Sequence, residues 1–295
     1  MPSSEGKQSG GNPFAPDMFD YRSSNTFNYF NALNPERRAL IKGLHEQIEA
    51  EKGLEKLFGL KDKALQEAID ADLAIYESPL MAAIERYGPG VMYQSMDFEA
   101  LPTGAQRRLL ENGVIISGMF GLLRPDDLIP MYKLKIDASV EGIGKMSKYW
   151  RPHLSPILNE LLKGRVVWNL LPGAHEETWE DDQSYDRMYR LKFFKEEKKK
   201  LKAVTHGVKE LRGSLINFIV TALAETVEAL EDWEAEDGFE PDYEASEMDE
   251  NGGGTIVMVS RPGWKKRRTT RRQAKAAIEA ERRARREAEL LDAEE

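Results

Sequence analysis

Two short runs of β-branched residues in the middle of the chain place the strongest constraint on its fold. Residues 114–117 and 166–170 are apolar along most of their length and end in polar residues, a pattern typical of buried strands in an α/β sheet. Between them, residues 148–162 carry apolar side chains at helical spacing. Because strands and helices alternate here, the sequence predicts a mixed α/β fold.

The second half of the chain adds a hairpin to this pattern. Residues 189–194 and 201–206 bracket the highly charged stretch 195–200, which favours two paired strands with a basic tip. Apolar residues at helical spacing follow over 212–230, and a last strand is expected at 255–259 after an Asn-Gly-Gly-Gly turn. The hairpin argues against a fully parallel sheet.

The first half is expected to be mainly helical. Residues 8–35 mix Ser, Asn, Gly and Pro with scattered aromatics, which favours an ordered loop laid over a core. A helix then begins at Asn34-Pro35, and a second covers about 61–74. Helical spacing predicts that the second helix buries five apolar residues: Ala64, Leu65, Ala68, Ile69 and Leu73.

Composition excludes several kinds of chemistry. The chain has no cysteine, which removes disulfides, thiolate catalysis, iron–sulfur clusters and cysteine-based zinc sites. None of the four histidines stands in a close metal-binding spacing, so we expect no metal and no cofactor. No stretch is long and apolar enough for a membrane helix, and the N-terminus lacks a secretion signal, so we expect a cytoplasmic protein without membrane contact.

Charge is distributed very unevenly along the chain. The net charge of −9 would repel nucleic acid if it were uniform. Residues 225–250, however, hold thirteen acidic residues and no Lys or Arg, whereas 261–286 hold twelve basic residues against two Glu. Residues 262–295 are rich in Ala, Arg and Glu with almost no apolar face, which predicts a protruding charged helix beyond a domain over 1–261. This tail would contact nucleic acid or dock on the acidic segment 225–250.

The densest group of potentially functional residues is the stretch ISGMFGLLRPDDLIPMYKLKI, residues 116–136. A strand ends at Ser117-Gly118, and the charged residues that follow would lie at a strand's carboxyl edge, where α/β proteins bind ligands. Arg124 would hold a phosphate or carboxylate with two hydrogen bonds, and Lys133 would do so as a point charge. In the alternative, Arg124 only pairs with Asp126 or Asp127 to shape a loop.

Several motifs in order resemble the YaaA family of peroxide stress proteins. SGMFGLLRPDDLIPMYKLKI is similar to the family signature SGLYGVLRPxDLIxPYRLEM. The agreement continues with Tyr149-Trp150, with the strand VVWNL at 166–170, and with KELRG at 209–213, which resembles K-x-x-RG. SSEGK at 3–7 is similar to the PSEGK loop of one branch. The resemblance spans roughly residues 1–261.

This resemblance implies a single-domain mixed α/β fold of the cantaloupe type, with a positively charged cleft and a helix-hairpin-helix element. It also implies binding of duplex or branched DNA and a role in protection against oxidative stress. Leu57-Phe58-Gly59-Leu60, within about 36–74, has the apolar-Gly-apolar form of a helix-hairpin-helix turn, whose free backbone N–H groups can receive a phosphate. Lys56, Lys61 and Lys63 flank it and would attract DNA without regard to sequence. In the alternative, the turn is only structural.

The predicted cleft gathers cations and polar groups from distant parts of the chain. They are Lys7, Arg124, Lys133, Lys135, Lys209 and Arg212, with Ser4, Ser117, Asn169 and His206. Lys209 and Arg212 would lie near a helix N-terminus, which favours an anion. His206 or Glu5 would be the acid–base group if the cleft catalyses a reaction, although a lone His is more often structural.

Two departures from the family pattern affect this cleft. Family members begin with an apolar strand before the PSEGK loop, whereas Met1 here directly precedes Pro2, so either a sheet position lacks its strand or the polypeptide starts upstream. Met131 replaces a Pro, and Lys135 stands where an acidic residue is common, which predicts a differently shaped and more basic loop.

These observations leave two classes of function. The first is a stress-response protein that binds DNA mainly through phosphates, since we find no base-reading helix and no aromatic stacking platform. The second is an enzyme that acts on a nucleotide, nucleobase or other anionic metabolite, with Arg124, Lys133 and Arg212 as anion holders. A third possibility is an interaction scaffold that works through its tail.

Overall fold

A computed structural model describes residues 1–13, 29–265 and 269. Residues 14–28 of the expected ordered loop lie outside this range, as does nearly all of the expected charged C-terminal helix. The described residues form a mixed α/β structure, as the sequence predicts.

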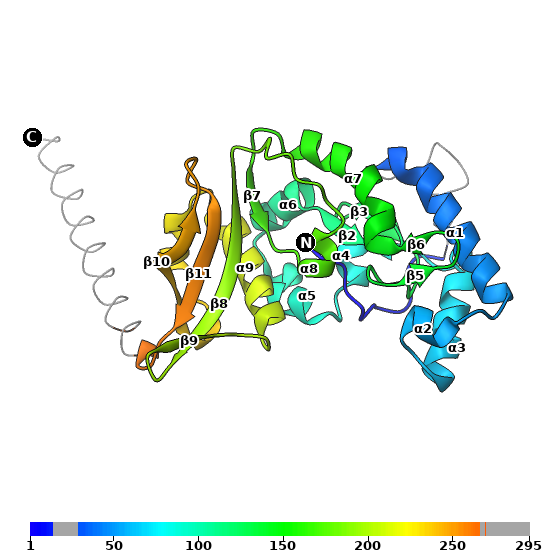
Figure 1. Ribbon diagram of the computed structural model, residues 1–295, viewed down its shortest axis with the longest axis horizontal. Helices are drawn as coiled ribbons and strands as arrows, with labels where there is room; N and C mark the ends of the chain where they lie inside the picture. The colour runs from blue at the N-terminus through cyan, green and yellow to red at the C-terminus, as the bar shows by residue number, and fades with distance from the viewer. Residues whose placement is uncertain (14–28, 266–268, 270–295) are drawn as a thin grey trace, which may run out of the picture.

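One mixed sheet dominates the molecule (Figure 1). Its strands, in spatial order, are β10 (Phe239–Met248), β11 (Gly254–Ser260), β8 (Arg187–Glu197) and β7 (Val166–Asn169). β7 and β11 run parallel to β8, whereas β10 is antiparallel to β11. β9 (Lys200–Ala203) pairs antiparallel with β8 and forms the predicted hairpin, which projects from one end of the molecule.

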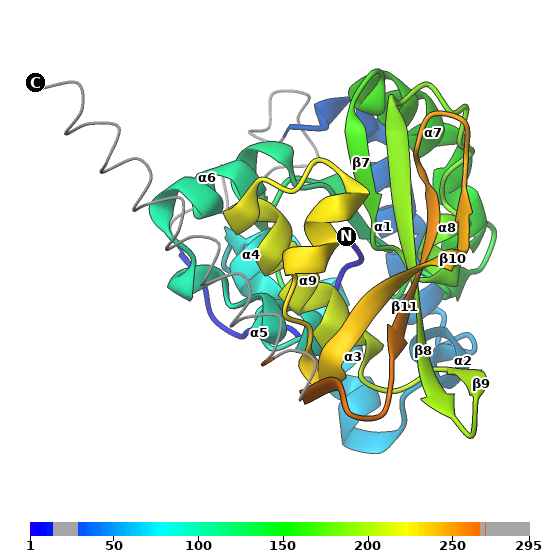
Figure 2. The same ribbon diagram turned by 90° about the vertical axis from the view of Figure 1, so that its left-hand side faces the viewer.

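Helices pack on both faces of this sheet. α9 (Val208–Ala222) lies on one face, whereas α7 (Met146–Leu162) and α8 (Gly173–Glu176) lie on the other (Figure 2). α9 begins four residues before the expected start at 212, so Lys209 belongs to its first turn. α9 packs closely on α5 (Val91–Met96), and a Cβ at Gly213 would lie only 2.1 Å from the carbonyl oxygen of Met92.

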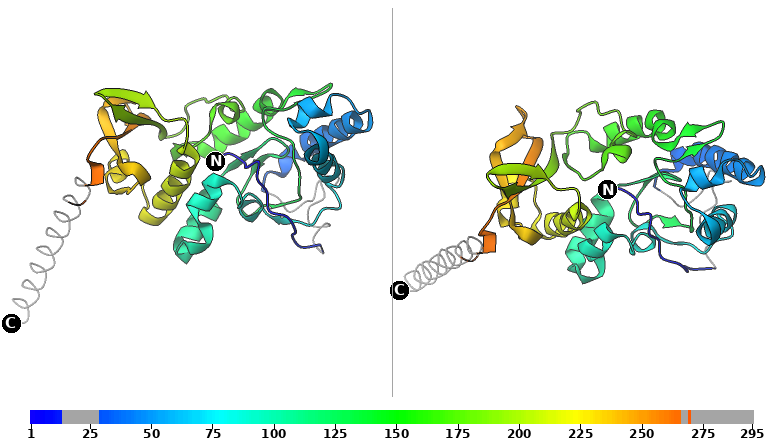
Figure 3. Two further views of the ribbon diagram at one scale, coloured as in Figure 1. Left: turned by 90° about the horizontal axis from the view of Figure 1, so that it is seen from below. Right: turned by 60° about the horizontal axis from the view of Figure 1, so that its bottom comes forward.

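A second, shorter sheet contains the Ser117 motif. β2 (Ile115–Ser117) and β3 (Gly121–Leu123) form an antiparallel pair in which every residue is buried. The first residues of the chain run parallel to β2: the N–H of Ile116 donates to the carbonyl oxygen of Met1 at 2.9 Å, and the N–H of Ser3 donates to that of Ile116 at 3.0 Å. The amino end therefore lies near the centre of the molecule, between the large sheet and the first helices (Figure 3).

The remaining small elements connect these parts. Two further two-stranded ladders join β1 (Met81–Ala82) to β4 (Leu128–Ile129) and β5 (Ser139–Val140) to β6 (Gly144–Lys145). Short helices α4 (Ala83–Arg86) and α6 (Thr103–Asn112) precede β2, and 3-10 turns occur at Asn31–Leu33, Phe98–Ala100, Val227–Asp232 and Glu236–Gly238.

The helices of the first half differ from the expected pair. α1 (Asn34–Glu49) ends well before the Gly59 turn, and a separate five-residue helix α2 (Leu54–Phe58) leads into α3 (Asp62–Leu73). The predicted inward face of α3 is wrong at both ends, because Ala64 and Leu73 are exposed. Asp72 is fully buried instead.

β10 is the longest of the described strands that the sequence did not predict. It lies inside the acidic segment, where charged residues disfavour a strand. Its start is fixed because Phe239 is buried against Phe193 of β8, and its ladder to β11 contains a register shift between Asp242 and Glu247. Within the described part of the chain, no helix has the length and apolarity needed to cross a membrane.

Candidate functional site

Three buried hydroxyl groups form a chain below the first residues of the protein. The hydroxyls of Ser117 and Tyr132 are 2.9 Å apart, and the Tyr132 and Tyr87 hydroxyls are 2.6 Å apart. Ser117 Oγ also accepts the backbone N–H groups of Met119 and Phe120, both at 3.2 Å, in the turn between β2 and β3. Burial raises the pKa of Tyr132 to about 12, although its hydrogen bonds to Ser117 and Tyr87 lower it in part, so this hydroxyl stays protonated at neutral pH.

Lys7 lies directly on these tyrosines. Its Nζ is 4.2 Å from the centre of the Tyr132 ring and 5.8 Å from that of Tyr87, and it donates to the carbonyl oxygen of Ser4 at 2.9 Å. Burial lowers the pKa of Lys7 to about 7, and the like charge of Lys133 acts in the same direction. Asp72 partly opposes this shift.

Asp72 is the second titratable group buried at this place. Its Oδ1 accepts the backbone N–H of Lys133 at 2.6 Å, whereas its Oδ2 has no hydrogen-bond partner among the described residues. Burial raises the pKa of Asp72 to about 7, although the Lys133 N–H and the charge of Lys7 lower it in part. An amine and a carboxyl group that both titrate near neutral pH therefore lie together.

Two more lysines complete a group that we call the lysine cluster: Lys7, Lys133, Lys135 and Lys209. Lys135 Nζ contacts Glu5 Oε2 at 2.9 Å. This contact lowers the pKa of the Glu5 carboxyl, as do the charges of Lys209 and Lys7, which places three of the four lysines around one exposed carboxylate. The fourth, Lys133, lies near Lys7 and Asp72. The structure thus brings together Lys7, Ser117, Lys133, Lys135, Lys209 and Glu5, as the cleft hypothesis requires.

Arg212 lies next to a histidine that the sequence did not single out. Burial lowers the pKa of Arg212, and Glu176 opposes that change. Burial also lowers the pKa of His175 to about 4, so its ring is neutral at physiological pH. Neither ring nitrogen of His175 has a hydrogen-bond partner among the described residues. His206, the predicted candidate, is exposed in the loop before α9.

Arg124 lies away from the lysine cluster and contacts backbone. Its guanidinium donates to the carbonyl oxygens of Leu110, at 2.9 Å from the terminal nitrogen, and of Glu111. It also stacks 4.7 Å from the centre of the Tyr29 ring. Asp127 accepts the backbone N–H of Arg124 at 2.7 Å, so the loop is shaped by this bond to the main chain. Arg124 is therefore used structurally here.

The Gly59 turn has the predicted conformation but little excess charge. Gly59 has φ +65° and ends α2. Lys61 lies 3.8 Å from Glu55, and Lys63 lies 3.6 Å from Glu67. Asp62 is the first residue of α3, so a carboxylate stands at the helix N-terminus itself.

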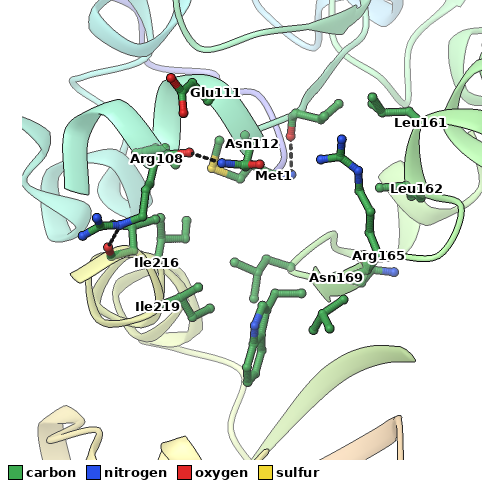
Figure 4. Close-up of a pocket in the computed structure, with 18 of the residues that line it drawn as sticks. Met1, Arg108, Glu111, Asn112, Leu161, Leu162, Arg165, Asn169, Ile216 and Ile219 are labelled. Carbon is green, nitrogen blue, oxygen red and sulfur yellow. Dashed lines mark hydrogen bonds between the residues drawn. The ribbon is translucent and has the colours of Figure 1, made fainter. Parts of the chain in front are cut away.

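A cavity of about 560 Å³ lies between the two sheets (Figure 4). β2 and β7 line opposite sides of it, and apolar residues of α7 and α9 such as Leu161 and Ile219 form its walls. Arg108 lies at its border and donates to the carbonyl oxygen of Val220. Of the predicted anion-binding residues, Arg124 alone belongs to the described lining of this cavity.

Comparison with known proteins agrees with the order of motifs. The family model described as peroxide stress protein YaaA matches residues 9–245. This chain belongs to the YaaA family. An uncharacterized protein of Campylobacter jejuni is 30% identical over 191 residues, which is 64% of this chain and 73% of that protein.

Two other YaaA-like relatives are more distant. A UPF0246 protein of Rickettsia bellii is 26% identical over 155 residues, 52% of this chain and 62% of the relative. A UPF0246 protein of Streptomyces coelicolor is 26% identical over 163 residues, which is 53% of this chain and 60% of the relative. This chain thus spans less than two thirds of these two relatives.

Sequence reasoning missed three side chains of this YaaA-family site: Asp72, Tyr87 and His175. A signal existed for Asp72, because it continues the helical spacing of Leu65, Ala68 and Ile69 and so places a carboxylate on the buried stripe of α3. Tyr87 precedes a Gly-Pro-Gly stretch, which carries no sign of its contact with Tyr132. His175 was recognised only as lacking a metal spacing, and its burial depends on tertiary structure.

Proposed function

We propose that this YaaA-family protein binds DNA in the response to peroxide stress, mainly through backbone phosphates. The family description supports the stress role. The lysine cluster is the observation that carries the binding: its four lysines lie around two carboxyl groups, those of Glu5 and Asp72, and phosphate contacts depend chiefly on such local excess of cations. Low sequence specificity is expected, because lysines contact phosphates as point charges. The cantaloupe description and the helix-hairpin-helix element stay predictions.

The β8–β9 hairpin offers a second contact with the same backbone. Lys198, Lys199, Lys200 and Lys202 are exposed at its tip, where the chain turns with positive φ at the first two. Glu197 pairs with Lys202, so the other three lysines carry the excess charge. A projecting basic hairpin can follow a phosphate backbone without reading bases.

Salt-dependent titration tests this proposal. Affinity of the intact chain for duplex and branched DNA should fall steeply as salt rises, with a slope set by the number of phosphates contacted. Changing Lys133 and Lys209 together to Gln should lower that slope by about 2 if both contact phosphates. The matched control changes Lys61 and Lys63 to Gln. If only the Lys61 and Lys63 variant lowers the slope, DNA is bound at the Gly59 turn. If neither variant lowers it, phosphate contact is refuted at the turn and at the lysine cluster.

The charged tail is tested by deletion of residues 262–295. If the tail contacts DNA, the salt slope falls on deletion because fewer phosphates are neutralised. If it docks on the acidic segment 225–250 instead, the slope does not fall for loss of phosphate contacts. Both outcomes depend on the opposite charges of residues 225–250 and 261–286.

An enzyme acting on a nucleotide, nucleobase or other anionic metabolite is the second candidate. One observation favours it. Lys7, within the lysine cluster, and Asp72, beside it, both have pKa values far from the ordinary ones, and such groups are common at catalytic sites. Titration with nucleotides and duplex in parallel separates the candidates. Nucleotide binding that depends on Lys133 and Lys209, without duplex affinity, would favour the enzyme.

A further inference from the structure

DNA binding leaves the most buried charges of the site unused. Contact with a duplex needs exposed cations, whereas Asp72 is fully buried and Lys7 is largely covered by the tyrosines and the Ser4 backbone. Asp72 Oδ2 faces no hydrogen-bond partner among the described residues. A buried carboxylate oxygen without a partner is costly, so this arrangement requires a reason other than phosphate attraction.

The surroundings of Lys7 favour its neutral amine. Burial and the charges of Lys133 and Lys135 disfavour the ammonium form, whereas Asp72, Glu5 and the Tyr132 ring favour it in part. Lys7 forms no ion pair with Asp72 in the described structure; its one strong contact is the carbonyl oxygen of Ser4. A neutral lysine amine at neutral pH is a nucleophile, which exposed lysines are not.

The groups around that amine suit a carbonyl reaction. The Tyr132 ring lies against the Lys7 Nζ, and its hydroxyl belongs to the chain from Ser117 to Tyr87, which can pass a proton. Lys133 and Lys135 lie near enough to Lys7 to act on its charge, and Lys135 and Lys209 do the same for Glu5, so these three lysines can hold an anion beside the amine. An amine, a chain of hydroxyls and a group of cations therefore lie together.

We propose that Lys7 is a nucleophilic amine that forms an imine with the aldehyde or ketone group of a small anionic molecule held by the lysine cluster. The proposal deepens the second candidate function and rests on it, and it is independent of DNA binding. The Lys7 nitrogen attacks the carbonyl carbon, a C–N bond forms, and the carbonyl oxygen leaves as water with the two hydrogens of the amine. Tyr132 relays a proton to that oxygen, and Asp72 accepts or returns one as the nitrogen changes its charge.

Labelling with pyridoxal 5′-phosphate tests this inference on the full chain, because the probe carries both an aldehyde and a phosphate. Borohydride reduction adds hydride to the imine carbon and fixes the probe, and peptide mapping then locates it. At pH 7 the label should enter Lys7 at least about tenfold faster than the exposed Lys63, since an ordinary lysine is almost entirely protonated there. Inorganic phosphate should slow labelling of Lys7 and leave Lys63 unchanged.

Variants separate the inference from the proposed DNA binding. Lys7→Arg should lose the fast label, whereas the matched control Lys63→Arg should keep it. Asp72→Asn removes the charge that supports the ammonium form of Lys7, so the pH midpoint of labelling should move down. Equal labelling of Lys7 and Lys63 in the unaltered protein would overturn the inference without requiring any variant to fold. Duplex affinity measured on the same samples reports on the DNA proposal alone.

Discussion

The lysine cluster and the Gly59 turn contain similar side chains in opposite surroundings. Lys61 and Lys63 are exposed, and each lies beside a glutamate, so their charges are largely compensated. Lys7 is packed on tyrosine rings near two other lysines, and its nearest carboxyl group is itself buried. The comparison shows that counting lysines near a motif does not locate a reactive or anion-binding place; burial and the partners of each lysine do.

The two regions should differ in how much unfolding free energy a Gly→Ala substitution costs in each. A Cβ at Gly118 would lie 2.5 Å from the carbonyl carbon of Lys135, so Gly118→Ala should push away the segment that carries the cluster and cost about 3 kcal/mol of unfolding free energy. Gly59 has open space around it, and Gly59→Ala should cost only about 1 kcal/mol, from its positive φ. Urea denaturation measures both, and equal costs would contradict the close packing at Gly118.

The next effect is the pH dependence of Asp72. Its pKa of about 7 in the folded protein lies above the ordinary 3.8, so the folded state loses stability as pH rises from about 4 to 7. Asp72→Asn removes this loss and keeps an oxygen for the Lys133 N–H. Because the shift is about three pKa units, the variant should gain up to about 4 kcal/mol relative to the parent at pH 7 and little at pH 4, measured by urea denaturation at both values. A gain of the same size at pH 4 would show that Asp72 does not ionise in this window.

Lys7 changes stability in the opposite sense at higher pH. Its folded pKa of about 7 lies below the ordinary 10.5, so the folded state binds fewer protons than the unfolded chain between these values. The contribution of Lys7 to the free energy of unfolding therefore rises as pH increases from about 7 to 10.5. Lys7→Met should flatten that rise in a series of thermal melts. A rise that survives the substitution would assign it to another group.

Tyr132→Phe tests the hydroxyl chain with a smaller expected effect. It removes the contacts to Ser117 and Tyr87 while the ring stays on Lys7, and a lost buried hydrogen bond costs about 1–2 kcal/mol. Thermal unfolding should show this loss. Labelling of Lys7 by pyridoxal 5′-phosphate should also slow, because the proton relay is broken. Unchanged labelling would limit Tyr132 to packing.

The smallest loss of stability is expected for substitutions at the Gly59 turn. Lys61→Gln and Lys63→Gln each remove one exposed ion pair, and such pairs contribute at most about 0.5 kcal/mol. Denaturant midpoints should hardly move. A larger loss would mean that the turn carries a contact absent from the described residues.

Much of the fold follows from local patterns in the sequence. The strands at 114–117, 166–170 and 255–259 and the helix over 148–162 recur in the structure within a few residues, because each is apolar with a clear period. β10 was missed because its pairing with β11, and not its acidic composition, makes it a strand. The separate helix α2 was not predicted because its five residues are too few to show a helical period.

The candidate site was predictable only in part. The motifs of the YaaA resemblance indicated Lys7, Ser117, Lys133 and Lys209, and the structure places them together. The same motifs also indicated Arg124, whose side chain the fold directs to the Leu110 carbonyl. No local pattern reveals such a choice, because it depends on which distant backbone atoms come within reach. Asp72 differs from Arg124: its helical spacing places it on the buried stripe of α3, and only its contact with the Lys133 N–H depends on the fold.

The acidic strand β10 forms the outer border of the large sheet, and this placement affects how molecules meet. A border strand exposes unpaired backbone groups that invite another chain to add itself. Here Glu240, Glu244 and Glu247 lie along that edge, and two copies brought together there would face repulsion between like charges. The same acidic composition that keeps the strand from being predicted thus discourages edge-to-edge pairing of sheets between molecules. Neutralising these three carboxylates should favour aggregation while the interior of each molecule remains intact.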